Sequence, residues 1–312
     1  MILVCGEALI DVVVGAGGGR RRSAGGGPFN TARALARLGV PTAFLGRLSG
    51  DPFGRWLAGL LVDDGASLAI ASASPEPTTL AIAKVNHAGQ AAYDFHIRDT
   101  SAPNLTSAMM PDQLAPTVDA LHVGTLGLLL EPMASTLVAF VKREGPGRLV
   151  MLDPNIRPVL VDDEDRYRQR LNSVVGRSTI VKASQEDLAW LYPDLSYEQA
   201  AETLMGRGVR LVIATLGAHG AYAVMRGVRV SVQATEAVVE DTIGAGDAFG
   251  AALLSWLNDN GALQVNFTMN EGQLRSALEF ACRVASITCS RVGADPPRRE
   301  ELVGRFSLKP SA

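Results

Sequence analysis

The chain has 312 residues, of which 47% are hydrophobic and 20% charged, and its formal net charge is −3. This composition predicts an ordered globular protein with a sizeable core, and it argues against a general nucleic-acid binder, which usually carries a basic excess. The three cysteines are sparse and lack C-x-x-C spacing, as is usual in a reducing compartment, and no apolar run is long enough to span a membrane. We therefore expect a cytoplasmic protein without membrane or nucleic-acid partners.

The N-terminal third of the chain mixes strand and helix patterns. An apolar opening segment predicts a buried strand, and the glycine-rich segment after it predicts a loop. Two helices are expected next, the second of which begins at an Asp-Pro pair and ends at a glycine. Alternating residues then predict two strands joined at residues 87–89, outside the strand–helix alternation. In order, these segments are residues 1 to about 10 (strand), 15–28 (loop), 29–39 (helix), 42–49 (strand), 51–65 (helix) and 78–97 (two strands).

From residue 120 onwards, strands alternate with helical patterns, which predicts a mostly parallel sheet with helices on both faces. Nothing in the sequence looks like an interdomain linker or a repeat, so we expect a single domain. The expected strands are 120–125, 148–153, 179–184, 211–216, 220–225 and 228–232. The expected helices include 131–145, 196–208, one that continues from about 248, and one over about 273–289.

Polar residues follow several of the apolar runs. They are Asp11 and the segments 153–155, 182–187, 215–217 and 241–247. In open α/β sheets, ligands bind at the carboxyl ends of the strands. We therefore expect these polar clusters to line one site.

The stretch DTIGAGDAFG, from Asp241 to Gly250, places three small residues before an acid at the start of an expected helix. The first N–H groups of a helix have no internal partner, so small residues there let a phosphate approach them closely. Asp247 would then lie beside the phosphate, where a carboxylate can accept a proton from an attacking hydroxyl. From the spacing alone, glycines in a tight turn before an ordinary helix-start acid explain the pattern equally well.

Other nucleotide-binding signatures are absent from the sequence. It has no G-K-[ST] of a Walker A loop, and no H-R-D or D-F-G of a protein kinase. The segment GAGGGR, residues 15–20, fails the G-x-G-x-x-G dinucleotide fingerprint at its last position. An NAD-dependent enzyme is therefore disfavoured.

Six motifs, taken in order, carry a resemblance to a known family. They are GEALID (6–11), GGGPFNTARALARLG (25–39), GRLSGDPFG (46–54), DPNIRP (153–158), TLGAHGA (215–221) and DTIGAGDAFGAALL (241–254). Together they resemble the motifs of the PfkB (ribokinase-like) family of carbohydrate kinases over nearly the whole chain. The resemblance implies a ribokinase-like three-layer α/β/α domain over residues 1–312, with a mostly parallel sheet and a small β lid from about 12–25 and 78–100. It also implies ATP binding without a Walker A loop.

The resemblance gives roles to residues of the first and last motifs. Asp247 matches the base that takes a proton from a sugar hydroxyl, and the three small residues before it match the family's anion hole. Asp11 and Asn30 match side chains that hold the sugar; the alternatives are a surface acid at a strand end and a helix cap. The matched anion-hole residues are Gly244, Ala245 and Gly246, and the matched sugar-contacting glycines are Gly25 and Gly26.

Two further segments resemble substrate-contacting parts of the family. FHIRDTSA, residues 95–102, resembles the lid segment of fructokinase-like members, in which Arg98 would reach the sugar or its phosphate. The alternative is an exposed lid arginine. DPNIRP suggests Asn155 and Arg157 near the phosphates, and its alternative is a structural turn after a strand.

The resemblance also places the nucleotide and metal contacts. VKASQED, residues 181–187, stands where the family often has an N-x-x-E motif tied to the water shell of magnesium. Here Ser184 and Asp187 occupy those positions, with Glu186 as a substitute for the acid and an ordinary helix-capping run as the alternative. Asp241 resembles part of the monovalent-cation site of some members, which would bind K⁺. The implied ATP contacts are Lys182, Ser184, Thr215, Gly217, Gly220, Ala281 and Ala285, of which the last two fit plain helix packing equally well.

The leading hypothesis is an ATP-dependent sugar kinase that uses Mg²⁺ and phosphorylates a primary hydroxyl, with fructose as the sugar and fructose 6-phosphate as the product. The alternatives within the family are a 2-keto-3-deoxygluconate kinase, a ribokinase and a nucleoside kinase. A non-catalytic sugar sensor is the alternative from another class. A lid sheet with exposed edges also predicts a homodimer.

Overall fold

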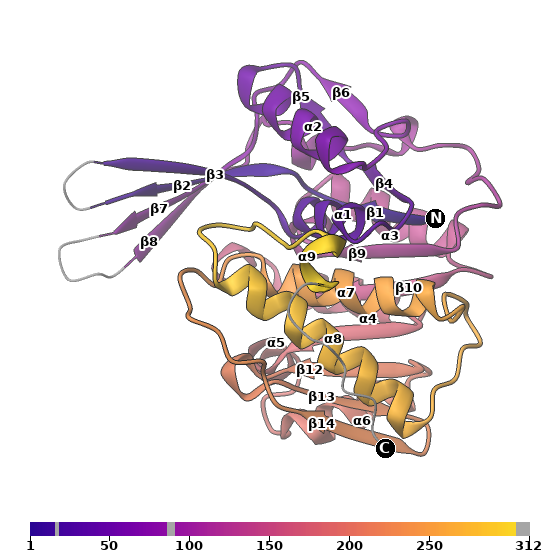
Figure 1. Cartoon of the computed structure of the whole chain (residues 1–312). Coiled ribbons are helices and arrows are strands. Elements are labelled where there is room, and N and C mark those ends of the chain that lie inside the picture. The colour runs from indigo at the N-terminus through magenta and orange to yellow at the C-terminus, as the bar shows by residue number, and fades with distance from the viewer. Residues whose placement is uncertain (16–18, 86–90, 304–312) are drawn as a thin grey trace.

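A computed structural model gives the structure of the protein, and it describes residues 1–15, 19–85 and 91–303. The centre of the molecule is an eight-stranded sheet (Figure 1). The strands from β4 to β12 are parallel to one another, whereas β13 pairs in antiparallel fashion with both of its neighbours, β12 and β14. In spatial order they are β14 (Val228–Val232), β13 (Ala221–Met225), β12 (Leu211–Thr215), β11 (Ile180–Ser184), β10 (Leu149–Asp153), β9 (Ala120–Gly124), β1 (Ile2–Cys5) and β4 (Thr42–Leu45).

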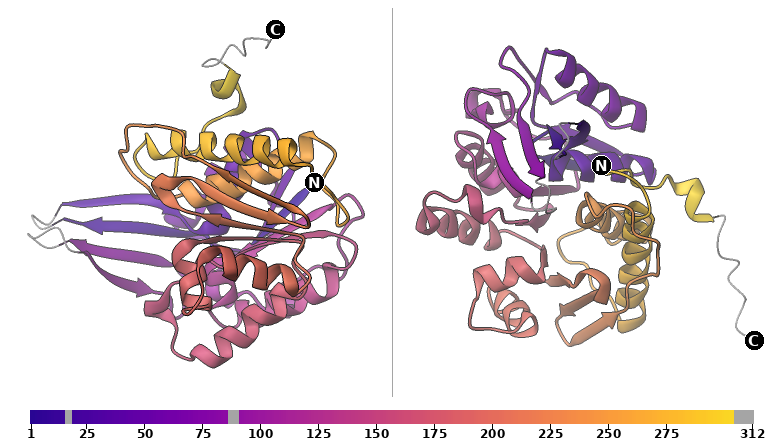
Figure 2. Two further views of the ribbon diagram at one scale, coloured as in Figure 1. Left: turned by 90° about the horizontal axis from the view of Figure 1, so that it is seen from below. Right: turned by 90° about the vertical axis from the view of Figure 1, so that its left-hand side faces the viewer.

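Helices cover both faces of this sheet, as Figures 1 and 2 show. Alternate residues of β1 point to opposite faces. Ile2 and Val4 share an apolar core with α1 (Gly27–Arg37), α2 (Pro52–Asp64), α7 (Ala245–Asp259) and α8 (Glu271–Cys289). Leu3 and Cys5 share the other core with α3 (Met133–Glu144), α4 (Glu164–Val175), α5 (Gln185–Leu191) and α6 (Tyr197–Gly206). The strand–helix alternation of the sequence thus gives the three layers that it predicts.

A second sheet projects from one side of the body (Figure 1). Its spatial order is β3 (Arg20–Gly25), β2 (Leu9–Val14), β7 (Leu80–Val85) and β8 (Ala91–His96). Strands β2 and β7 are parallel, and each pairs with its outer neighbour in antiparallel fashion. We call these four strands the lid sheet.

Short elements complete the described chain. Two strands, β5 (Arg47–Ser49) and β6 (Ser72–Ser74), form a small parallel sheet. The 3₁₀ helices are η1 (Ala102–Asn104), η2 (Ser107–Met109), η3 (Thr125–Leu128), η4 (Pro158–Leu160) and η5 (Gly217–His219), and the last helix is α9 (Arg299–Val303). Across the described ranges, no helix has the length and apolar character that a bilayer crossing requires.

Two segments expected as single strands are in fact two strands each. The opening segment divides at Gly6 into β1 and β2, and the segment 42–49 divides at Gly46 into β4 and β5. A Cβ atom at Gly6 would lie 2.5 Å from Cγ of Pro28, and one at Gly46 would lie 2.3 Å from the carbonyl oxygen of Gly6. The chain therefore leaves the main sheet at Gly6 and again at Gly46, and these two glycines contact each other. This contact is tertiary, so the apolar pattern of the sequence does not reveal the two breaks.

The glycine-rich segment 15–28 is also not only a loop. Its second part forms β3, which pairs with β2 residue by residue from Gly25 opposite Leu9 to Arg20 opposite Val14. The three arginines of this strand are exposed, so backbone pairing rather than apolar side chains defines it. The expected connection at residues 87–89 lies outside the described residues.

Candidate active site

A cavity of about 900 Å³ lies at the carboxyl ends of the central strands, facing the lid sheet. All the polar clusters that follow apolar runs contribute to it or to its rim, although they are far apart in sequence. The sequence-predicted residues that line it are Asp11, Gly26, Asn30, Asn155, Arg157, Lys182, Ser184, Asp187, Thr215, Gly217, Gly244, Gly246 and Asp247. Glu186 lines it as well.

Asp247 is the central acid of the cavity. It lies in the first turn of α7, is 8% exposed, and its Oδ2 accepts a hydrogen bond of 2.9 Å from Nδ2 of Asn30. Burial raises the pKa of the Asp247 carboxyl to about 6, with a smaller increase from the charge of Asp153, while Asn30, Lys182 and Arg157 pull it down. A carboxylate with a pKa just below neutrality is ionised at pH 7 and can still accept a proton, as a general base requires.

The N-terminus of α7 is shaped for an anion. Gly244 has a φ of 78° in the left-handed region, and it precedes the first helical residues, Ala245 and Gly246. A Cβ atom at Gly244 would lie 2.6 Å from Cβ of Ala294, so the loop after α8 packs directly against this turn. Free N–H groups and the helix dipole make such a terminus a binding site for phosphate.

Lys182 adds a positive charge next to this terminus. A Cβ atom at Gly246 would lie 3.0 Å from Nζ of Lys182. Nζ also forms a buried ion pair of 2.7 Å with Oδ2 of Asp153. Burial lowers the pKa of the Lys182 ammonium, but the charge and hydrogen bond of Asp153 outweigh it, so the pKa is raised overall and the ammonium stays charged. The other oxygen of Asp153 is buried and has no hydrogen-bond partner among the described residues.

The opposite side of the cavity is formed by the lid sheet and the start of α1. Burial raises the pKa of Asp11, on β2, to about 6, and Arg157 opposes the rise. Gly25 leaves room for this acid, because a Cβ atom there would lie 2.0 Å from Oδ2 of Asp11. Gly26 has a φ of 106°, and a Cβ atom there would lie 2.7 Å from the carbonyl oxygen of Glu7. Both glycines thus have steric reasons for their identity.

Glu7 is a residue of this cavity to which the sequence analysis gave no role. It is 1% exposed, and its carboxyl accepts hydrogen bonds from the backbone N–H groups of Gly27, at 3.2 Å, and Gly127, at 3.0 Å. Burial raises the pKa of Glu7 to about 8, and the nearby charge of Asp247 adds to the rise. Through these bonds Glu7 joins the β1–β2 turn, α1 and η3 at the cavity wall. The sequence signal that could have identified it is its position as an acid within an apolar opening segment.

The segments after β10 and β11 meet at the cavity floor. Asn155 has a φ of 39°, and its side-chain oxygen accepts a hydrogen bond of 2.6 Å from Arg157. Ser184 and Asp187 form a capping box at the start of α5, as the capping alternative predicted. The two oxygens of Asp187 accept the N–H groups of Ile156, at 2.7 Å, and Ser184, at 2.9 Å. Asp187 therefore ties the two segments together while it lines the cavity.

Asp241 lies at the edge of the site. It does not line the main cavity; its carboxylate accepts hydrogen bonds from the N–H groups of Ile243, at 3.1 Å, and Gly293, at 3.0 Å, and pairs with Arg21 of β3 at 3.4 Å. Within the ranges that the structure describes, no group of three or more His, Cys, Asp or Glu side chains gathers closely enough to hold a metal ion by itself.

A neighbouring cavity of about 430 Å³ shares Thr215, Gly217, Thr242 and Gly246 with the main one. Gly220, Ala245 and Ala285 also line it, and its walls consist mostly of small or apolar residues. The structure thus places most of the expected nucleotide contacts around one space. Ala281 is fully buried in the core and does not line this cavity, as the packing alternative for this residue predicts.

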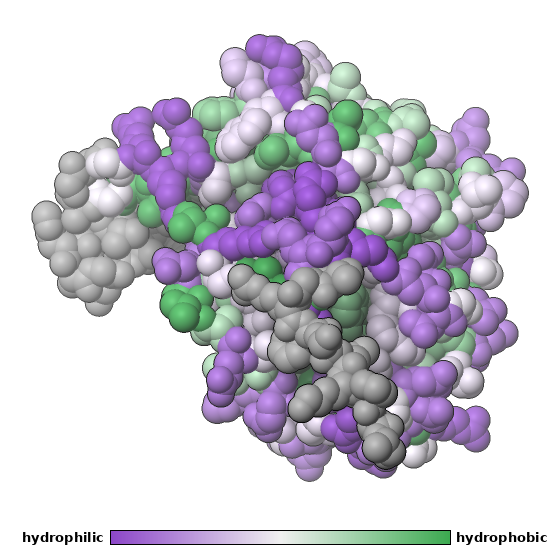
Figure 3. Space-filling view, in the orientation of Figure 1, coloured by the Kyte–Doolittle hydropathy of each residue, from purple (hydrophilic) through white to green (hydrophobic). Residues whose placement is uncertain are grey.

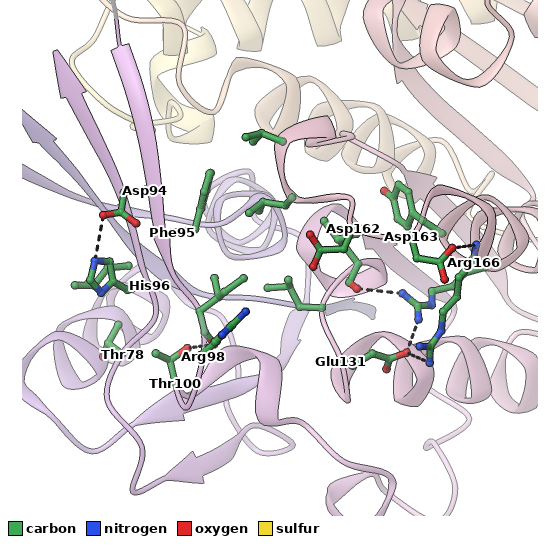
Figure 4. A pocket seen from close by; sticks show the side chains of 18 of the residues that line it. Thr78, Asp94, Phe95, His96, Arg98, Thr100, Glu131, Asp162, Asp163 and Arg166 are labelled. Carbon is green, nitrogen blue, oxygen red and sulfur yellow. Dashed lines mark hydrogen bonds and ion pairs between the residues drawn. The ribbon is translucent and has the colours of Figure 1, made fainter. Parts of the chain in front are cut away.

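Arg98 lies outside both of these cavities. It lines a hollow of about 820 Å³ between β8 and the segment from η4 to α4. Asp162, Asp163 and Arg166 lie across this hollow (Figure 4). Phe95 lines both this hollow and the main cavity, so the two are adjacent. In this conformation Arg98 does not share a cavity with Asp247.

A three-layer α/β fold that places a buried carboxylate in the first turn of a glycine-preceded helix, opposite a lid sheet, has the arrangement that phosphoryl transfer to a small hydroxyl compound requires. The chain belongs to the pfkB family of carbohydrate kinases, whose family model matches residues 1–301. It is therefore a carbohydrate kinase, and the resemblance deduced from the motifs is confirmed.

Curated relatives are similar over most of their length. The fructokinase of Rhizobium leguminosarum bv. trifolii is 37% identical over 287 residues, which cover 91% of this chain and 86% of that protein. Fructokinase-1 of Oryza sativa subsp. japonica is 33% identical over 284 residues, which cover 89% of this chain and 85% of that protein.

Solved structures share the fold. The fructokinase from Xylella fastidiosa with bound ATP has a TM-score of 0.88 at 25% identity and covers 97% of this chain and 96% of its own. The fructokinase from Vibrio cholerae O395 bound to fructose, ADP and calcium ion has a TM-score of 0.80 at 27% identity, with 94% of each chain covered. The predicted fold class is thus confirmed.

Proposed function

We propose that this carbohydrate kinase transfers the γ-phosphate of ATP to a primary hydroxyl of fructose and so forms fructose 6-phosphate. One observation carries the proposal: the buried Asp247 carboxylate, hydrogen-bonded to Asn30 on the sugar side, lies in the first turn of the helix whose N-terminus would hold the phosphate. The names of the relatives support fructose, and the Xylella fastidiosa and Vibrio cholerae structures, with ATP and with fructose and ADP, support both substrates.

The residues divide the reaction between them. The sugar lies against Asp11, Asn30 and the glycine pair before α1, which orient its primary hydroxyl toward Asp247. The Asp247 carboxylate takes the hydroxyl proton as the oxygen forms its bond to the γ-phosphorus, and the bond to the β,γ-bridging oxygen breaks, so that ADP leaves. The N–H groups at the start of α7 and the Lys182 ammonium stabilise the negative charge on the phosphoryl oxygens.

Magnesium would accompany the nucleotide. The acid oxygens near the floor of the cavity suit a hard cation through bridging waters, since Asp187 keeps lone pairs beyond the two N–H groups that it accepts, and Glu186 lines the same cavity. When bound, Mg²⁺ supplies neutralisation of phosphate charge. We assign Asp187 and Glu186 to its water shell.

The remaining parts of the proposal concern closure and surroundings. The lid sheet would close over the sugar and exclude water, and closure would bring Arg98 to the substrate. The outer strands β3 and β8 offer edges for a homodimer. We place the protein in the cytoplasm. A monovalent cation such as K⁺ would bind at Asp241 in competition with Arg21, which pairs with this carboxylate.

The test is ATP consumption with Mg²⁺ across fructose, 2-keto-3-deoxygluconate, ribose, glucose and a nucleoside, for the wild type and for Asp247→Asn. We expect rapid turnover with fructose that the variant abolishes. Turnover with another sugar of the panel would replace fructose by that substrate. Binding of a sugar without turnover in either protein would overturn the kinase proposal and favour a sensor.

A further inference from the structure

A cluster of charged residues with a buried centre lies behind the N-terminus of α7, and the mechanism above does not use it. At its centre is Asp64, the last residue of α2, whose side chain is 3% exposed. Its Oδ2 accepts a hydrogen bond of 2.7 Å from Nε of Arg33. Its Oδ1 accepts two hydrogen bonds, one of 2.8 Å from Nε of Arg37 and one of 2.9 Å from Nη2 of Arg298. We call these residues, with Asp295, the arginine cluster.

The cluster joins three segments that are distant in sequence. Arg33 and Arg37 belong to α1, Asp64 ends α2, and Arg298 and Asp295 belong to the segment between α8 and α9. Arg37 also pairs with Asp295 at 2.6 Å, and the Nη1 of Arg33 donates to the carbonyl oxygen of Ala294 at 3.3 Å. Hydrophilic residues form a band over the middle of the face drawn in Figure 3, where α9 lies in Figure 1.

Two of these segments touch the catalytic elements directly. Ala294 packs against Gly244, and the N–H of Gly293 donates to Asp241, which precedes the same turn. On α1, Asn30 lies one turn before Arg33 and holds Asp247. The cluster therefore fixes α1 and the segment 293–295 relative to each other. Both of these segments contact the start of α7, so together they hold it in place.

We propose that Asp64 is a positioning residue for the phosphate-binding terminus of α7, acting through Arg33 and Ala294; this inference rests on the proposed kinase function for its catalytic consequence. Without the carboxylate, Arg33, Arg37 and Arg298 face one another with only Asp295 of the cluster to offset them. Their repulsion would move the segment 293–295 away from Gly244. Small misplacements of a phosphate-holding group reduce the rate while sugar binding at the opposite wall persists.

The test uses Asp64→Asn, which keeps the shape of the side chain and removes its charge. We expect kcat to fall about tenfold or more, with the KM for fructose unchanged within about twofold. The matched control is Glu144→Gln on the opposite face of the sheet, because Glu144 is 6% exposed in its side chain and pairs with Arg143 at 2.9 Å and Arg148 at 3.3 Å. The control should lose thermal stability without losing kcat.

A double-mutant cycle identifies the route. Ala294→Gly removes the methyl group that contacts Gly244, and we expect it to lower kcat on its own. If Asp64 acts through Ala294, the double variant loses little more than the more damaging single variant. Losses that multiply would overturn the route, and an unchanged kcat in Asp64→Asn would overturn the proposal.

Amide hydrogen exchange makes the test independent of turnover. Peptides covering residues 241–248 and 291–296 should exchange faster in Asp64→Asn than in the wild type, and should not do so in Glu144→Gln. If the wild type phosphorylates no sugar, the proposed function fails, and exchange still decides whether Asp64 holds this terminus. If Asp64→Asn does not fold, Arg298→Gln, at a half-exposed member of the cluster, should show the same exchange pattern to a smaller degree. Unchanged exchange in the folded variants would overturn the inference.

Discussion

Replacing Asn30 by alanine should raise the midpoint of the acid limb of the pH–activity profile. The amide of Asn30 donates a hydrogen bond of 2.9 Å to the Asp247 carboxylate, which favours the ionised form. A hydrogen bond to a charged group contributes about 1.5–3 kcal/mol, and about 1.4 kcal/mol corresponds to one pH unit. The pKa of Asp247 should therefore rise from about 6 to roughly 7–8 in Asn30→Ala.

The assay is kcat/KM for the preferred sugar between pH 5 and pH 9, since this quantity reports the ionisation of the free enzyme. The wild type should lose activity below about pH 6, where Asp247 becomes protonated. In Asn30→Ala the midpoint should move upward, and the alkaline plateau should also fall because the proposed contact of Asn30 with the sugar is lost. Asn155→Gly is the control, since Asn155 lines the same cavity at a positive φ and its side chain bonds to Arg157 rather than to Asp247. Arg157, whose charge lowers the pKa of Asp247, keeps its hydrogen bonds to the carbonyl oxygens of residues 155 and 156, so the control should lower the plateau and move the midpoint much less than Asn30→Ala does. A midpoint that stays near pH 6 in Asn30→Ala would refute the reasoning.

Three further substitutions test the same geometry. Asp247→Asn should reduce kcat by at least about a thousandfold. Because the folded-state pKa of Asp247 lies above its ordinary 3.8, the variant should also be more stable than the wild type by up to about 3 kcal/mol above pH 6. This gain should vanish below pH 4, as thermal unfolding at both pH values would show. Gly244→Ala should lower the free energy of unfolding by about 1–2 kcal/mol through its left-handed backbone and by about 1–3 kcal/mol through crowding of Ala294. It should also lower kcat. Denaturant unfolding and rate measurements check the two effects, and wild-type values would contradict the packing argument. Lys182→Met should destabilise by about 3–5 kcal/mol because Asp153 stays buried without its partner, and the double variant with Asp153→Leu should recover part of that loss.

Local sequence patterns predicted the layers and the polar clusters that line the main cavity. The strand–helix alternation gave the main sheet, and the polar residues after the apolar runs led to the cavity. The polar residues that end β10, β11 and β12 or follow them share one edge because those strands are parallel and adjacent. The small residues before Asp247 were informative because they mark a tight turn into a helix whose first N–H groups a ligand could approach closely.

Long-range packing was beyond the reach of the same patterns. The break at Gly6 depends on Gly46 and Pro28, which approach it only in the folded chain. The residue pattern predicted a loop where β3 lies because the arginines of this strand lack apolar alternation, and only the family resemblance implied a β lid that includes residues 12–25. The pairing of β3 with β2 is a tertiary property. Asp64 looks like an ordinary helix-end acid until α1 and the segment after α8 surround it.

The hydrogen bond between Asn30 and Asp247 joins residues that are 217 positions apart. During synthesis, the strands of the proposed sugar wall leave the ribosome long before Asp247, the proposed base, and Ala294, which contacts the turn before it, emerges later still. Under the proposed mechanism, a nascent chain therefore cannot transfer phosphate before residue 247 has been made. For the same reason, a single cut between Asn30 and Asp247 separates the base from its partner, and neither fragment carries a complete catalytic centre unless the two reassociate.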